Sequence, residues 1–428
     1  MKKTVNSKIE DILNVTSMQH WYYNIYKNAK DSKTLMMDLE FVFSGTVDLS
    51  ILKKSWNLIL KKYPMLRTAF YETKTHEVFQ VVYKDYYIEI ESVNWKGVNP
   101  HKQEKLTQNL RNEQNKKRID LQAPPLLKLY LIQKTSNEFS LRWNFPVLLM
   151  DGWNVPIIFN ELISFYSAYS RGKNPGLVLE SYSMKDYIVY QRDRDKSEDE
   201  IFWKNYLLPL ENVAQPKNKD SHPLDYQRID VDLSAVEDRI RERAKKIGVS
   251  LNCIFQLSYM LALARLQNRK QVFSRTTVAD RPMTIKDIHN RVGLYINEIP
   301  IKLTVKDQSF EEMAKSLQND LNQVFSHVSC SLEEISSFVG NESLLAIDNT
   351  ITFENMPMEE IDYSSLPFSL SSTNFVNHPY GKVNIFIWPS KNMNIKLLYD
   401  AKTYSKEDMI ELGNRMKDIL TVSYTHLT

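Results

Sequence analysis

The chain has 428 residues. A single hydrophobic core rarely forms from so many residues, so we expect two or three domains. Its 55 Lys and Arg residues nearly balance its 52 Asp and Glu residues, and this net charge of +3 argues against a nucleic-acid-binding protein, which needs a basic face. Its ten glycines form none of the phosphate-binding loops or serine-nucleophile turns that many enzymes use.

Helix and strand patterns alternate through the first half of the chain. Asp48 can cap a helix that ends at Pro64, because its carboxylate can accept bonds from the free amides of the first turn. Strands are expected at 35–45, 66–70, 76–93, 126–132 and 139–150, and a second helix at 154–169. The last two strands are almost continuously apolar, so we expect them to be neighbours with both faces covered. The polar segment RGKNPG, residues 171–176, is the best linker candidate.

The second half repeats this mixture. Helices are expected to begin at Ser234, Ser250, Ser309 and Ser405, and strands at 271–278, 293–305, 349–355, 383–388 and 394–400. The pairs Ser309/Glu312 and Ser331/Glu334 have the spacing of capping boxes, in which a hydroxyl and a carboxylate exchange bonds with free amides. We therefore expect an α+β protein of two lobes that are joined near residues 172–180.

The two cysteines, Cys253 and Cys330, lie far apart without metal-ligand spacing. They exclude a disulfide scaffold and a zinc ribbon and fit a reducing compartment. The N-terminus lacks the apolar segment of a signal peptide, and no apolar run approaches the ~18 residues of a membrane span. We expect a cytoplasmic protein without membrane or nucleic-acid partners.

Six strings, in order along nearly the whole chain, resemble motifs of the condensation domains of nonribosomal peptide synthetases. They are NVTSMQHWYY, KKYPMLRTAFYE, LLMDGW, SMKDYIVYQRDRD followed by EIFWKNYL, Arg281-Pro282 followed by VGLYINEIPIKL, and NTITFENMP. The resemblance implies two chloramphenicol-acetyltransferase-like lobes in a V-shaped pseudo-dimer, residues 1–175 and 176–421, with a tunnel between them. Residues 422–428 are expected to be a truncated or artefactual tail.

The resemblance also implies the chemistry and the partners. Donor and acceptor carrier proteins, of the peptidyl or aryl type, would each deliver a phosphopantetheine arm, and adjacent synthetase domains would flank this one. An acceptor amine would attack a donor thioester and form an amide. No metal and no bound cofactor is implied.

The active-site motif HHxxxDG is incomplete in this chain. When the motif is aligned on Asp151 and Gly152, its two histidines fall on Pro146 and Val147. The second histidine of the family deprotonates or positions the amine, and a valine side chain has no atom that accepts a proton. The catalytic residue is therefore unknown, and we expect weak activity at most.

The resemblance assigns roles to other motif residues as well. Asp151 is expected to be structural rather than catalytic and to pair with Arg281, whereas Arg67 is expected to be a fixed ion-pair partner rather than a substrate ligand. Trp153, Tyr295 and Asn297 would either face the tunnel or pack within the lobes.

Three functions stay open on the sequence alone. The first is a slow condensation domain. The second is an inactive relative that docks carrier proteins or recruits a partner enzyme. The third, an acyltransferase of the same fold that uses a free acceptor, is disfavoured because such relatives also use the missing histidine.

Overall fold

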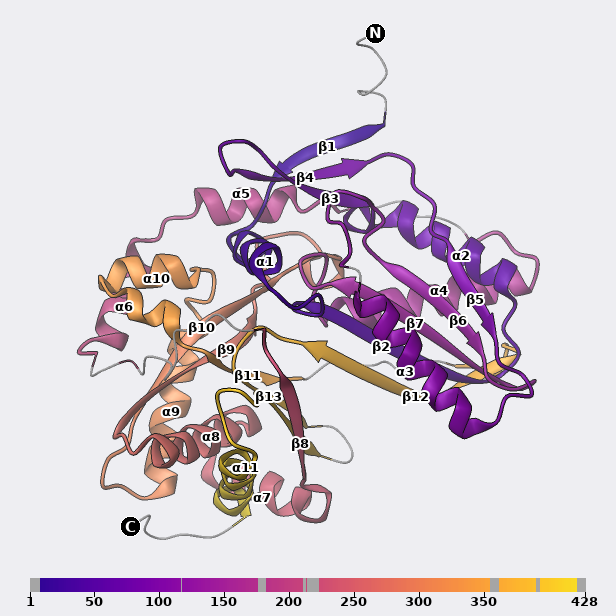
Figure 1. The fold of residues 1–428 in the computed structure, drawn as a ribbon. Coiled ribbons are helices and arrows are strands. Elements are labelled where there is room, and N and C mark those ends of the chain that lie inside the picture. Colours follow the sequence, from indigo (N-terminus) through magenta and orange to yellow (C-terminus); the bar gives the residue numbers. More distant parts are fainter. Residues whose placement is uncertain are drawn as a thin grey trace. The chain divides into compact units, whose positions relative to one another are not determined.

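A computed structural model of the chain describes residues 8–116, 118–175, 182–210, 213, 223–354, 362–389 and 393–421 (Figure 1). The chain divides into two compact units. The first consists of Met1–Asp193, Arg281–Tyr295 and Met356–Pro379, and the second of Arg194–Asp280, Ile296–Asn355 and Tyr380–Thr428. Both units contain helices and sheet, so the predicted α+β class is confirmed.

The predicted boundary between residues 175 and 176 lies at the edge of residues 176–181, which are outside the described residues, as are residues 422–428. Both therefore stay predictions. Helix α5 (Lys185–Asp193), which that boundary assigns to the second lobe, groups with the first unit.

The first unit contains a five-stranded sheet and a three-stranded sheet. The strand order of the larger sheet is β12 (Phe368–His378), β2 (Met36–Gly45), β7 (Glu138–Pro146), β6 (Lys128–Gln133), β5 (Ile90–Asn94). The strand order of the smaller sheet is β1 (Ile9–Asn14), β4 (Val78–Tyr83), β3 (Thr68–Glu72). Strands β6 and β7 pair antiparallel, as the sequence predicts. Edge strand β12 pairs antiparallel with β2, and Figure 1 shows the two strands side by side.

Helices cover the two faces of the five-stranded sheet. The first unit has α1 (Ser17–Asn28), α2 (Leu49–Lys62), α3 (Pro100–Lys116) and α4 (Asn154–Ser170) in addition to α5. Trp56 of α2 contacts Trp143 of β7, and Phe159 of α4 stacks on Phe41 of β2, so these helices cover the aromatic face. Helix α3 lies on the opposite face, where Arg111 pairs with acidic side chains of β2.

The helix boundaries in the first unit follow local chemistry. The Asp48 carboxylate accepts hydrogen bonds from the amides of Ser50 and Ile51, which caps α2 as predicted. The helix ends at Lys62, just before Pro64, because proline cannot donate the bond that would continue it.

The second unit is built on a six-stranded sheet. Its order is β10 (Ile296–Thr304), β9 (Gln271–Ala279), β11 (Asn349–Phe353), β13 (Val383–Trp388), β14 (Asn394–Asp400), β8 (Tyr226–Asp232). Its helices are α6 (Ser197–Leu207), α7 (Glu237–Ile247), α8 (Leu251–Gln267), α9 (Phe310–Val324), α10 (Leu332–Val339) and α11 (Lys406–Thr421). Helix α8 buries residues on all its faces and forms the centre of the hydrophobic core.

Two capping boxes predicted from the sequence are confirmed in the second unit. Ser309 and Glu312 start α9, and Ser331 and Glu334 start α10, with both reciprocal hydrogen bonds present in each. Within the described part of the chain, no single helix is long and apolar enough to cross a membrane; one pair, Ser234–Ile247 with Leu251–Gln267, meets that length and composition together but is bent by 102°.

Candidate functional site

The incomplete HHxxxDG motif lies in the first unit, where strand β7 passes into helix α4. Pro146 is the last residue of β7 and is opposite Met36 of β2. The amide of Val147 donates a hydrogen bond to the carbonyl of Leu35 at 2.8 Å, and the amide of Leu149 donates to the carbonyl of Pro146 at 3.0 Å. The first bond joins the motif to the residue before β2, and the second closes a turn after β7. The backbone of the motif is therefore ordered, although no imidazole is present at its first two positions.

Asp151 is the centre of a buried hydrogen-bond network. Its side chain is almost fully buried, and its Oδ1 atom lies 3.3 Å from Nη2 of Arg281. The backbone amide of Tyr295 donates to Oδ2 at 2.8 Å, and the side-chain amide of Asn154 donates to Oδ1 at 2.6 Å. The predicted pairing of Asp151 with Arg281 is confirmed. Burial raises the pKa of the Asp151 carboxyl, and Arg281 and the Tyr295 amide oppose that rise.

Arg281 connects Asp151 to the segment that follows it. Its Nη1 atom donates to the carbonyl of Ile288 at 2.7 Å and to the carbonyl of Arg291 at 3.1 Å. Its guanidinium lies 4.6 Å from the ring centre of Tyr295 and 5.8 Å from that of Trp153. One buried side chain thus holds a loop of the first unit at three places.

Asn154 and Gly293 join the motif to the same loop. Nδ2 of Asn154 donates to the carbonyl of Gly293 at 2.8 Å, and the amide of Gly293 donates to Oδ1 of Asn154 at 3.1 Å. The amide of Asp151 also donates to the Gly293 carbonyl, at 3.3 Å. A Cβ atom at position 293 would lie 2.3 Å from Sδ of Met184 and 3.0 Å from Cε2 of Tyr295, so these side chains would have to shift to admit any other residue.

Comparison with known proteins identifies the family. The family model described as "Condensation domain" matches residues 9–428. The chain belongs to the condensation-domain family. This confirms the resemblance found in the sequence.

The curated relatives of this condensation domain are much longer proteins. It is 26% identical over 96% of its length to gramicidin S synthase 2 of Brevibacillus brevis, and 26% identical over 98% to bacitracin synthase 3 of Bacillus licheniformis. The chain spans only 9% and 7% of the lengths of these two relatives. The first condensation domain of the calcium-dependent antibiotic synthetase has a similar fold, with a TM-score of 0.80, 13% identity and 96% of each chain covered.

The structure places the three residues expected to face the tunnel in different surroundings. Trp153 is partly exposed, and its indole N–H donates to the carbonyl of His289 at 3.2 Å. Tyr295 is fully buried, and its ring lies 5.0 Å from that of Tyr187. Asn297, in the second unit, donates from Nδ2 to the carbonyls of Val328 and Cys330. Tyr295 and Asn297 make these packing contacts, and whether any of the three residues faces a tunnel stays a prediction.

Arg67 has the surroundings of a fixed structural residue. It is 4% exposed, and its Nη1 atom lies 2.7 Å from Oε2 of Glu10. Its Nε atom donates to the carbonyl of Leu60 at 2.8 Å. The predicted ion pair is therefore present, between η1 (Pro64–Arg67) and β1.

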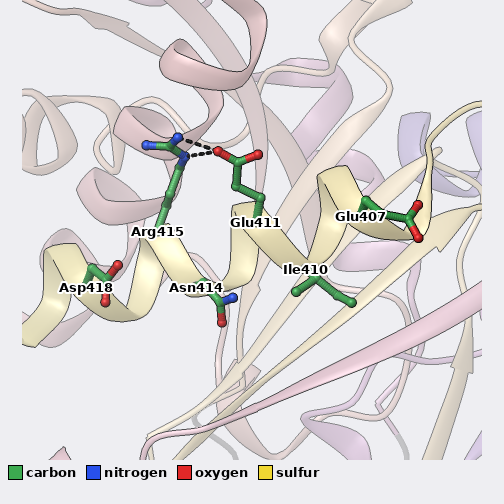
Figure 2. Close-up of a pocket in the computed structure, with 6 residues that line it drawn as sticks. All are labelled: Glu407, Ile410, Glu411, Asn414, Arg415 and Asp418. Carbon is green, nitrogen blue, oxygen red and sulfur yellow. Dashed lines mark hydrogen bonds and ion pairs between the residues drawn. The ribbon is translucent and has the colours of Figure 1, made fainter.

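Other parts of the described structure offer no comparable site. The residues that the structure describes contain no group of three or more His, Cys, Asp and Glu side chains arranged to hold a metal ion. Figure 2 shows a shallow depression on the exposed face of α11, lined by Glu407, Ile410, Glu411, Asn414, Arg415 and Asp418. Arg415 is paired with Glu411 there, and no motif residue contributes to it.

Sequence reasoning missed Asn154 and Gly293. Asn154 lies two residues after the motif, at the start of a helix, where an asparagine is usually taken for a cap. Gly293 lies within a segment that the sequence predicts to be strand as a whole, whereas β10 begins only at Ile296. The low glycine content of the chain is the signal that points to it, because a glycine that persists in such a sequence often marks a close approach of two chain segments.

Proposed function

We propose that this condensation domain forms an amide between an acyl or aminoacyl thioester on a donor carrier protein and an amine on an acceptor carrier protein, and that it does so slowly. The observation that supports the proposal is the network around Asp151. Hydrogen bonds of Asp151 and Asn154 fix the motif loop to residues 281–295, although Pro146 and Val147 replace the histidines. The network keeps the backbone of the motif loop in place, and a fixed backbone is what orientation of the two reactants requires.

The proposed reaction needs one proton transfer. The neutral amine attacks the thioester carbonyl carbon, a C–N bond forms and the C–S bond breaks. One amine proton must leave, and the departing phosphopantetheine thiolate must receive a proton. No metal or bound cofactor takes part in this proposal.

The missing histidines reduce the expected rate without abolishing it. A positioned general base typically contributes ~10²–10⁴-fold, whereas holding the two reactants together can contribute ~7–11 kcal/mol. An α-amine has a pKa of about 7.7–8.0, so part of it is already unprotonated at neutral pH. Slow condensation is therefore compatible with Pro146 and Val147.

Trp153 is the residue that we propose to contact the substrate. It follows the motif directly and is partly exposed, unlike Tyr295. The second candidate function is a non-catalytic domain that docks carrier proteins or recruits a partner enzyme, and the loss of both histidines is the observation that favours it. Carrier proteins and adjacent synthetase domains are the proposed partners under either function.

The deciding experiment restores the histidine. The purified domain is supplied with loaded donor and acceptor carrier proteins, and amide formation is followed by mass spectrometry. Val147 is the only partly exposed residue of the segment 146–151 and lies in the turn after β7, so a substitution there disturbs the buried core least. We expect V147H to raise the rate, by at most ~10²–10⁴-fold. V147F is the matched control because it adds similar bulk without a titratable nitrogen.

Three results are informative. A gain with V147H but not with V147F supports slow condensation. No amide from the unaltered protein or from V147H, with carrier binding still measurable, supports the docking function instead. Fast condensation that V147H cannot improve would contradict the claim that the missing histidines limit the rate.

A further inference from the structure

His289 is held in place by the motif residues themselves. It lies in the 3₁₀ turn η3 (Ile288–Asn290), within the loop that belongs to the first unit. Arg281, which is paired with Asp151, donates to the carbonyls of Ile288 and Arg291 on either side of it. Trp153 donates to the carbonyl of His289 itself. The backbone around His289 is therefore fixed by Arg281, the partner of Asp151, and by Trp153, the residue that follows the motif.

The imidazole of His289 is available for chemistry. The residue is exposed, and its ring centre lies 6.4 Å from that of Trp153. Its Nε2 atom is 3.0 Å from Sδ of Met283, which is 80% exposed, so the contact is not a buried packing contact. Besides Arg281, which is paired with Asp151, the charged groups of the same loop are Lys286 and Asp287, which lie 3.9 Å apart, and Arg291.

Two of these charges are already engaged elsewhere. The Asp287 carboxylate accepts a hydrogen bond from the hydroxyl of Tyr182, and the Arg291 guanidinium pairs with Asp186 at 2.8 Å. Neither group is directed by these contacts towards the His289 ring. The imidazole therefore combines a fixed backbone with a side chain that can accept a proton.

His378 is the strongest competitor among the histidines of the first unit. It lies in one row across the sheet with Met36 and Pro146, two strands from the motif position. Burial, together with the nearby Lys33 and Arg111, lowers the pKa of His378 to about 4. Proton transfer to such a group from an ammonium of pKa about 8 is disfavoured by roughly 10⁴-fold. His378 is thus a poor base at neutral pH.

We propose that His289 accepts the amine proton in this domain, in place of the histidines that Pro146 and Val147 have displaced. The inference rests on the proposed condensation function. As the C–N bond forms, the amine proton passes to an imidazole nitrogen of His289. The imidazolium then gives that proton to the thiolate released when the C–S bond breaks, so the ring returns to its starting state.

The test compares variants in the carrier-loaded condensation assay. H289A and H289Q should each lower the rate by about 10²-fold, the lower end of what a positioned base contributes. Both should also change the shape of the pH profile of the rate, because they remove a proton-accepting side chain, and free imidazole should partly rescue H289A. H101A is the matched control, because His101 is also exposed in the first unit and lies on α3.

A double variant separates shared from independent roles. If His289 substitutes for the missing histidine, H289A should cost less in the V147H background than in the unaltered chain. Amide formation at equal rates by the unaltered domain and H289A would overturn the inference and leave the proposed function intact. Equal losses in H289A and H101A, or an unchanged pH profile, would also overturn it. Absence of any amide from the unaltered domain would instead overturn the proposed function, and the inference with it.

Discussion

Replacing Asp151 by asparagine tests the network that fixes the motif loop. Each carboxylate oxygen accepts two bonds, Oδ1 from Asn154 and Arg281 and Oδ2 from Tyr295 and Arg281. An asparagine offers one oxygen and one NH₂ group, so whichever way it turns, its NH₂ group faces donors. Arg281, of which 3% of the side chain is exposed, also loses its charge partner.

The expected cost follows from these contacts. Breaking a buried ion pair by removing one partner typically costs ~3–5 kcal/mol. For units of 150–250 residues, 1 kcal/mol corresponds to about 2–4 °C in melting temperature, so D151N should lower it by roughly 6–20 °C. Thermal unfolding followed by circular dichroism measures this shift directly.

Two comparisons make the assay specific. E311Q removes an exposed charge that is 2.7 Å from Lys315, and it should leave the melting temperature nearly unchanged, because solvent screens such a pair. The double variant D151L/R281M replaces both charges by apolar groups and should recover part of the loss. An unchanged melting temperature in D151N would refute the argument, because the pair would then carry no stability.

Two further predictions concern the first unit. Burial lowers the pKa of His378 to about 4, so the unfolded chain, with an ordinary histidine, binds the proton more tightly than the folded one. The free energy of unfolding should therefore be full above about pH 6.5 and fall by up to about 3 kcal/mol as the pH drops to 4. Urea unfolding of H378Q should lack that pH-dependent component. Gly45 has a φ of +120°, and a Cβ atom there would lie 2.2 Å from the carbonyl oxygen of Pro367. G45A should therefore destabilise the β2–β12 pairing and lower the urea midpoint of unfolding. G172A, at a position with open space around it, should lower that midpoint less.

Elements with a strong local signal could be predicted from the sequence. The Asp48 cap and the Ser309 and Ser331 capping boxes each depend on residues within one helical turn, and all three are present. The pairing of β6 with β7 followed from two apolar runs that a short turn connects. The Asp151–Arg281 pair, in contrast, came from the resemblance to the family, since nothing local connects residues 130 positions apart.

Two of the missed elements, β12 and α3, do not show apolar residues at a regular spacing. Strand β12 reads FSLSSTNFVNH, and its residues Ser371–Asn374 are exposed, as polar residues on an edge strand usually are. Helix α3 is polar along most of its length and is attached to the sheet through Arg111 rather than through an apolar stripe. Periodicity detects neither kind of element, because both are held by partners distant in the sequence.

The exposed position of His289 also could not be inferred from its neighbours in the sequence. Its placement depends on Arg281 and on Trp153, which bond to the backbone of its turn and not to its ring. A histidine in a loop is usually an ordinary surface residue, and only the contacts of the folded loop distinguish this one from His101.

The pairing of β12 with β2 has a consequence for how the protein is made. The two strands are more than 300 residues apart in the chain, so β2 has no neighbour on that side until β12 has left the ribosome. At ~5–20 residues per second, that delay is roughly 15–60 s. During it, the first 193 residues expose an unpaired strand edge, the kind of surface that promotes association between chains. The yield of folded protein should therefore depend on what shields this edge during synthesis, such as a chaperone, more than on the final stability of either unit.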